Sequence, residues 1–167
     1  SLFNISAMSF GSLSKNAILA LNNGAKQGGF YHNTGEGGLS PYHLQGGDVV
    51  WNIGTGYFSC RTDEGKFNYE EFVKRATLEN VKMIEIKFSQ GAKPGHGGIL
   101  PKEKVTDEIA AIRLVSKGKD ILSPPTHSAF STPLELIEFV KLLRKGSGGK
   151  PIGIKICIGN KSEFISI

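Results

Sequence analysis

Short apolar runs alternate along this chain with longer amphipathic segments. The apolar runs at 3–8, 83–88 and 152–157 are typical of buried parallel strands, and a second short strand is expected to enter Asn33-Thr34. The amphipathic segments predict helices at 14–28, 69–78, 106–115 and 132–146. Ser14, Asn68 and Thr132 stand where helix N-caps belong. In the first helix, Ala17, Leu21 and Ala25 define the expected inner face.

Strands that alternate with helices favour βαβ units and a parallel sheet. The glycine-rich and aromatic segment 35–65 interrupts this alternation, and we expect a hairpin around Val49 to Cys60. The predicted fold class is therefore α/β of the (β/α)8 TIM-barrel type. Four units are half of such a barrel, which needs about 250 residues, so 1–167 is expected to be a partial barrel domain of a longer polypeptide. A doubly wound sheet is the alternative, but the chain lacks its dinucleotide fingerprint.

Composition excludes several classes of function. The chain has 167 residues, of which 39% are hydrophobic and 21% charged, as in ordinary globular proteins. No apolar run approaches the roughly 20 residues of a membrane helix and no signal segment opens the chain, so we expect a cytoplasmic protein without a membrane partner. The net charge of +5 is dispersed, which argues against nucleic acid. Cys60 and Cys157 lack metal-ligand spacing, so no metal site is predicted, and both are expected to be buried or half-buried.

The strongest candidate site follows the run 83–88. Residues 90–98 contain four glycines, whose backbone N–H groups a ligand can approach closely. Lys87, Gln90 and Lys93 add charge and hydrogen-bond donors at the same place. The other strand ends carry Ala7-Met8-Ser9, Asn33-Thr34 and Lys155, and in a barrel such ends form the active site.

Several separated blocks carry a resemblance to a known family. In chain order they are 5–14, 33–38, 53–58, 90–98, Leu100-Pro101 with Lys104-Val105, Ile109-Ala110 with Arg113, and Ser123-Pro124-Pro125 with His127. Together they resemble the flavin-binding synthase domain of glutamate synthase, most closely its amidotransferase-less branch. The resemblance runs from Ile5 to about Lys155.

The resemblance implies that FMN lies across the strand ends. The main chain of Ala7 and Met8 and the hydroxyl of Ser9 would meet the isoalloxazine edge. Thr34, Gln90 and Lys155 would bind the pyrimidine side. A fixed ammonium such as that of Lys155 stabilises the negative charge of a reduced flavin and raises its reduction potential.

The resemblance also implies the substrates, 2-oxoglutarate and ammonia. They would condense to an imine, which hydride from reduced FMN converts to glutamate. Lys87, Gln90, Lys93 and Arg113 would bind the dicarboxylate through charge-assisted bonds. Lys87 and Glu36 are the expected catalytic residues, with Glu36 helping to accept ammonia.

Some questions remain open at the level of sequence. His96 stands where the family usually has Glu, and His96 and His127 have either proton-transfer or loop roles. The electron donor could be NADPH, NADH or ferredoxin, electrons and ammonia could come from separate subunits, and cysteines outside this chain could hold an iron–sulfur cluster. The rival hypotheses are another FMN-dependent barrel, such as a 2-hydroxy-acid oxidase, and a non-catalytic half-barrel. An isolated half-barrel should self-associate through its exposed strand edges and be inactive.

Overall fold

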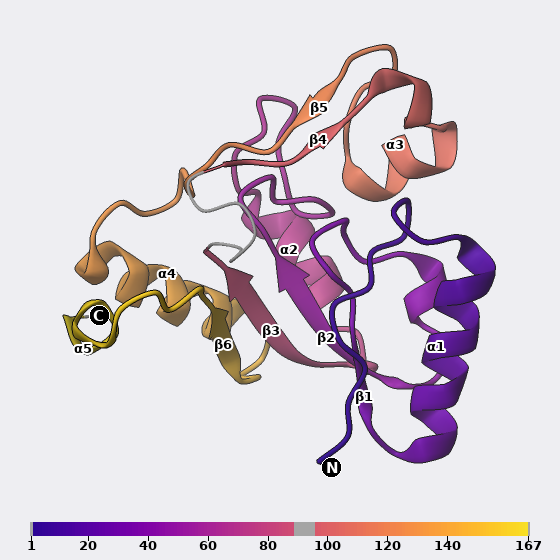
Figure 1. The fold of residues 1–167 in the computed structure, drawn as a ribbon, viewed down its shortest axis with the longest axis horizontal. Helices are drawn as coiled ribbons and strands as arrows, with labels where there is room; N and C mark the ends of the chain where they lie inside the picture. The colour runs from indigo at the N-terminus through magenta and orange to yellow at the C-terminus, as the bar shows by residue number, and fades with distance from the viewer. Residues whose placement is uncertain (1, 89–95, 167) are drawn as a thin grey trace.

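The computed structural model describes residues 2–88 and 96–166 and is built around a four-stranded parallel sheet (Figure 1). In chain order the elements are α1 (Lys15–Gly28), β1 (Tyr31–Asn33), η1 (Pro41–His43), β2 (Asp48–Ile53), α2 (Tyr69–Ala76), β3 (Val81–Lys87), β4 (Ile99–Leu100), η2 (Lys102–Lys104), α3 (Asp107–Arg113), β5 (Ile121–Leu122), α4 (Pro133–Gly146), β6 (Ile152–Lys155) and α5 (Lys161–Ser166). The strand order is β1-β2-β3-β6, and a parallel bridge from Ile5 to His32 extends the pairing beyond β1. The order follows the sequence and does not reverse within the described residues.

The predicted helix starts are confirmed by their caps. Backbone N–H groups of the first helical turn donate to the side chains of Ser14, Asn68 and Thr132, which satisfies donors that a helix end leaves unpaired. Thr132 also forms a capping box with Glu135. Gly29 ends α1 in the left-handed conformation at φ 63°, a geometry that favours glycine.

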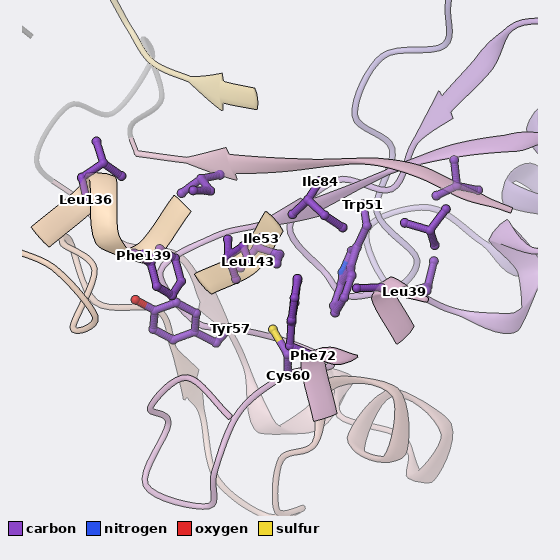
Figure 2. Close-up of a cluster of buried hydrophobic side chains, with 14 residues drawn as sticks. Leu39, Trp51, Ile53, Tyr57, Cys60, Phe72, Ile84, Leu136, Phe139 and Leu143 are labelled. Carbon is purple, nitrogen blue, oxygen red and sulfur yellow. The ribbon is translucent and has the colours of Figure 1, made fainter. Parts of the chain in front are cut away.

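The main core lies between the sheet and the helices α2 and α4. Trp51 and Ile53 of β2 and Ile84 of β3 point towards Phe72 of α2 and Leu143 of α4 (Figure 2). The rings of Trp51 and Phe72 stack with centroids 5.6 Å apart. Burial of these large apolar side chains is the main force that holds the helices on the sheet.

The opposite face of the sheet is polar. Successive side chains of a strand alternate between faces, and residues in register on parallel neighbours share a face. Asn52 is in register with Glu85, and Lys87 with Lys155. Because Glu85 and Lys87 are two residues apart on β3, these four side chains lie on one face, away from the apolar cluster. The carboxyl end of this face is where the candidate site lies.

The predicted hairpin around Val49 to Cys60 is wrong. Residues 48–53 form β2, which pairs in parallel with β1 on one side and with β3 on the other. The aromatic and glycine-rich surroundings suggested a turn, but residues 49–53 are all buried, as in a central strand of a parallel sheet.

Three smaller predictions also need correction. The run 3–8 forms no regular strand, although Ile5 is bridged to His32 and the N–H of Met8 donates to the carbonyl of Asn33. The buried positions of α1 are Ile18, Asn22 and Ala25, so its inner face is rotated from the expected one. Cys60 is buried as predicted, but Cys157 is exposed.

Beyond the carboxyl ends of β2 and β3, the two-stranded antiparallel ribbon of β4 and β5 lies with α3 (Figure 1). The apolar–polar pattern did not predict this ribbon, whose strands have only two residues each. The described chain is thus a mixed α/β structure with a parallel sheet. Among its described helices, none combines the length and apolar character that a membrane span requires.

Candidate functional site

An ion pair stands at the carboxyl end of β3. The Nζ atom of Lys87, the last residue of the strand, lies 2.9 Å from Oε1 of Glu36. The side chain of Lys87 is only 14% exposed, whereas that of Glu36 is 38% exposed. Gly54, just after β2, gives Glu36 room, because a Cβ at this glycine would lie 3.0 Å from Oε2 of Glu36. The two predicted catalytic residues therefore meet, although 51 positions separate them in the sequence.

Lys155 stands beside this pair. It ends β6 in register with Lys87, so both ammonium groups project from the same face of neighbouring strands. The backbone N–H of Phe88 donates to the carbonyl of Lys155 at 2.9 Å and fixes the two strand ends to each other. Two neighbouring cations, one of them in an ion pair with Glu36, give this edge an affinity for anions.

Glu85 lies on the same face of β3, two residues before Lys87, and the sequence analysis assigned it no role. Its Oε1 accepts hydrogen bonds from Nδ2 of Asn33 at 2.9 Å and from Nδ2 of Asn52 at 2.5 Å. Oδ1 of Asn33 in turn accepts from the N–H of Gly35 at 3.0 Å. This network joins the ends of β1, β2 and β3, and Glu36 directly follows Gly35, its last member. The signal in the sequence was a carboxylate in an otherwise apolar run.

Arg113 lies close to Glu36 and is buried at 7% exposure. It is the last residue of α3, and its Nη2 donates to the carbonyl of Phe10 at 3.3 Å while its guanidinium lies 5.0 Å from the centre of the Phe58 ring. Burial lowers the pKa of Arg113, and the negative charge of Glu36 opposes that shift. Arg113 is therefore not the surface arginine that a place on a short helix would suggest.

A small polar pocket joins these groups to the N-terminal segment. It has a volume of about 130 Å³, and Ser9, Glu36, Gly37 and Arg113 contribute to its wall. A Cβ at Gly37 would lie 2.8 Å from Cβ of Ser9 and 3.1 Å from Nη2 of Arg113, so this close approach requires glycine. The pocket has room for a group such as a carboxylate.

The segment before β1 contains the predicted flavin contacts Ala7, Met8 and Ser9, and hydrogen bonds to other parts of the chain hold it in place. The N–H of Met8 donates to the carbonyl of Asn33 at 3.1 Å, and the carbonyl of Met8 lies 3.0 Å from Nε2 of His43. Ala7, Met8 and Ser9 are all partly exposed. The segment thus lies fixed against β1 while its surface stays open to a ligand.

Thr34 is fully buried at the end of β1. Its hydroxyl donates to the carbonyl of Gly35 at 2.9 Å and accepts from the N–H of Asn52 at 3.0 Å. Thr34 therefore joins β1 to β2. A flavin that bound to its hydroxyl would share this group with Gly35 and Asn52. Gln90 and Lys93, the remaining predicted ligands, lie outside the described residues.

Two buried histidines pack between the sheet and the N-terminal segment. The rings of His32 and His43 have centroids 5.1 Å apart. Burial, and secondarily the nearby His43, lower the pKa of His32 to about 4. Burial also lowers the pKa of His43, although its bond to the Met8 carbonyl opposes the shift. Neither ring nitrogen of His32 has a hydrogen-bond partner in the described part of the chain.

These features define an α/β protein with a positively charged, polar site at the carboxyl ends of parallel strands. The model of a conserved region in glutamate synthase matches residues 1–167, so the chain belongs to the glutamate synthase family. No group of three metal-ligating side chains occurs among the residues at 2–88 and 96–166.

Three curated relatives illustrate the match. A glutamate synthase large subunit-like protein of Bacillus subtilis, YerD, is 46% identical over 161 residues, which are 95% of this chain and 30% of that protein. The archaeal glutamate synthase [NADPH] of Methanocaldococcus jannaschii is 34% identical over 98% of this chain and 30% of its own length. The glutamate synthase [NADPH] large chain of Bacillus subtilis is 34% identical over 92% of this chain and 10% of its own length. The chain thus spans a third or less of the length of these relatives.

Proposed function

We propose that this chain is the first half of a (β/α)8 barrel in an FMN-dependent oxidoreductase that reductively aminates 2-oxoglutarate to glutamate. The observation that carries the proposal is the meeting of Lys87, Glu36 and Lys155 at one edge of the sheet, beside buried Arg113. The sequential strand order supports a barrel over a doubly wound sheet, whose strand order reverses.

The donor set at this edge suits a flavin. The pyrimidine side of an isoalloxazine carries carbonyl and nitrogen acceptors, and the Lys155 ammonium on the polar face supplies a fixed donor for them. Ser9 and the Met8 main chain would support the ring edge from the N-terminal segment. When bound, FMN supplies the hydride of the reaction.

The remaining polar groups suit a 2-oxo dicarboxylate. Lys87 would hold one carboxylate or the oxo group, and Arg113 would attract a carboxylate in the pocket that it shares with Ser9. Glu36 carries the only carboxylate within salt-bridge distance of Lys87 among the described residues, and it would orient ammonia towards the oxo carbon. Gln90 and Lys93 would complete the set from the glycine-rich segment.

Replacing Lys155 with alanine should lower the reduction potential of the bound flavin. The ammonium stabilises the anionic reduced form more than the oxidised form, so its loss disfavours reduction. Redox titration of the flavin in protein made from the full coding sequence measures the midpoint. Lys150→Ala is the control, since Lys150 bonds to the carbonyls of Ala76 and Leu78 at the other end of the sheet. An unchanged midpoint in Lys155→Ala would place this ammonium away from the flavin.

The 167-residue chain alone should bind FMN weakly, lack activity and self-associate. The phosphate of a barrel ligand commonly binds after strands seven and eight, which the proposal places outside these residues. Apolar side chains are also exposed around β6, with Ile154 at 44%, Ile158 at 55% and Ile165 at 71%. Light scattering during an FMN titration tests both expectations. A monodisperse monomer that binds FMN tightly would contradict the half-barrel proposal.

A further inference from the structure

His127 forms a buried link to the end of β3. It lies in the segment between β5 and α4, directly after Thr126, and its side chain is 8% exposed. Its ring is enclosed by aromatic side chains, stacking on Phe130 with centroids 4.8 Å apart and meeting the edges of Tyr57 at 5.3 Å and Phe88 at 5.9 Å. Most buried polar groups in proteins are hydrogen-bonded.

Both nitrogens have partners, and these partners define the tautomer. Nε2 lies 2.9 Å from the carbonyl oxygen of Lys87, and Nδ1 lies 2.9 Å from the hydroxyl of Tyr57. A carbonyl oxygen can only accept, so Nε2 must carry the proton. The Tyr57 hydroxyl then donates to Nδ1 while accepting from the N–H of Ala129 at 3.1 Å. Burial lowers the pKa of His127, in keeping with a neutral ring, although the bond to Lys87 opposes the shift.

The link acts where β3 leaves the sheet. On one side of the Lys87–Phe88 peptide the carbonyl is held by His127, and on the other the N–H of Phe88 is held by the Lys155 carbonyl at 2.9 Å. The position of the Lys87 Cα, and hence the reach of its ammonium to Glu36, depends on this peptide. An apolar side chain could fill the aromatic cage, but it would not donate to the Lys87 carbonyl as His127 does.

We infer that His127 is a positioning residue that holds the Lys87 ammonium against Glu36 through the main-chain carbonyl of Lys87. In this role His127 acts through Lys87 and needs no contact with the ligand. The role of the Lys87–Glu36 pair in catalysis rests on the proposed function. The link from the His127 ring through the Lys87 carbonyl to the Lys87 ammonium does not, because it is a matter of geometry alone.

The test compares His127→Met with His127→Gln by the rate at which an amine-acylating reagent modifies Lys87. Met and Gln have similar size, but only Gln offers an N–H to the carbonyl. We expect His127→Met to raise the Lys87 rate by about tenfold, the scale of a lost buried hydrogen bond, and His127→Gln to stay within about twofold of the unchanged protein. Lys82, at the start of the same strand and 50% exposed, is the internal control and should keep its rate.

Equal acceleration of Lys87 in both variants, or none in either, would overturn the inference. If His127→Met unfolds, the acylation rate of Lys82 will rise too. The tautomer of the His127 ring in the unchanged protein then tests the inference instead. Long-range ¹H–¹⁵N spectra should show His127 with its proton on Nε2, and a proton on Nδ1 alone would overturn the link. Loss of 2-oxoglutarate binding plays no part in either readout, so failure of the proposed function remains a separate result.

Discussion

Replacing Lys87 with alanine should weaken 2-oxoglutarate binding by about 1–3 kcal/mol, the scale of a lost charge-assisted bond. Lys87 is mostly buried at a strand end and already holds a carboxylate, that of Glu36, at 2.9 Å. A ligand carboxylate at the same place would gain a partner that is screened little by water. Isothermal titration of 2-oxoglutarate into protein made from the full coding sequence measures the effect, and Gln90→Ala should weaken binding in the same range.

Lys82→Ala is the matched control for Lys87→Ala. Lys82 belongs to the same strand but stands at its other end, exposed and 3.9 Å from Asp48, so its removal should not change the affinity. Glu36→Gln gives a second check. This substitution removes the negative charge that competes with a ligand carboxylate for the Lys87 ammonium, so oxo-acid binding should not weaken while ammonia-dependent turnover falls. Equal small losses at Lys87, Gln90 and Lys82 would remove the assignment.

The second large effect is a loss of stability in acid. His32 has an ordinary pKa of 6.5 when the chain is unfolded, and its folded pKa is about 4. Below pH 6.5 the unfolded chain therefore takes up a proton that the folded chain refuses, and the free energy of unfolding falls as the pH falls. The loss begins near pH 6.5 and reaches about 3 kcal/mol by pH 4 for this one group. The lowered pKa of His43 adds a loss of the same sign.

Urea unfolding between pH 7 and pH 5 measures this dependence, in a range above the titration of ordinary carboxylates. His32→Phe should reduce it to the part that His43 and His127 contribute, because the substituted ring does not titrate and the original ring nitrogens have no hydrogen-bond partner within residues 2–88 and 96–166. The same slope in His32→Phe as in the unchanged protein would show that another group causes the acid sensitivity.

Local patterns in the sequence predicted the helices α1 to α4 and two of the main strands well. Caps at Ser14, Asn68 and Thr132 depend on bonds within one turn, so the nearby residues suffice to place them. β2 was missed because its identity depends on pairing with β1 and β3, which lie at 31–33 and 81–87. Pairing between distant segments is not encoded in any local window of the sequence.

The candidate site was only partly predictable, because some of its contacts also depend on distant segments. Lys87 and Lys155 follow from the rule that polar residues at strand ends gather at one edge, and the structure places them in register. The ion pair with Glu36 and the burial of Arg113 depend on how segments 35–38 and 107–113 fold over that edge. Glu85 and His127 were not assigned, because their partners lie on other strands or loops and become visible only in three dimensions.

The central claim is that the carboxyl ends of these strands hold a flavin and an oxo acid side by side. A crystal structure of protein made from the full coding sequence, soaked with FMN and 2-oxoglutarate, tests it most directly. The account predicts flavin density across the ends of β1, β3 and β6, with its pyrimidine side against Lys155 and the oxo acid in contact with Lys87. Density for either molecule away from this edge, with the Lys87–Glu36 ion pair unchanged, would contradict it.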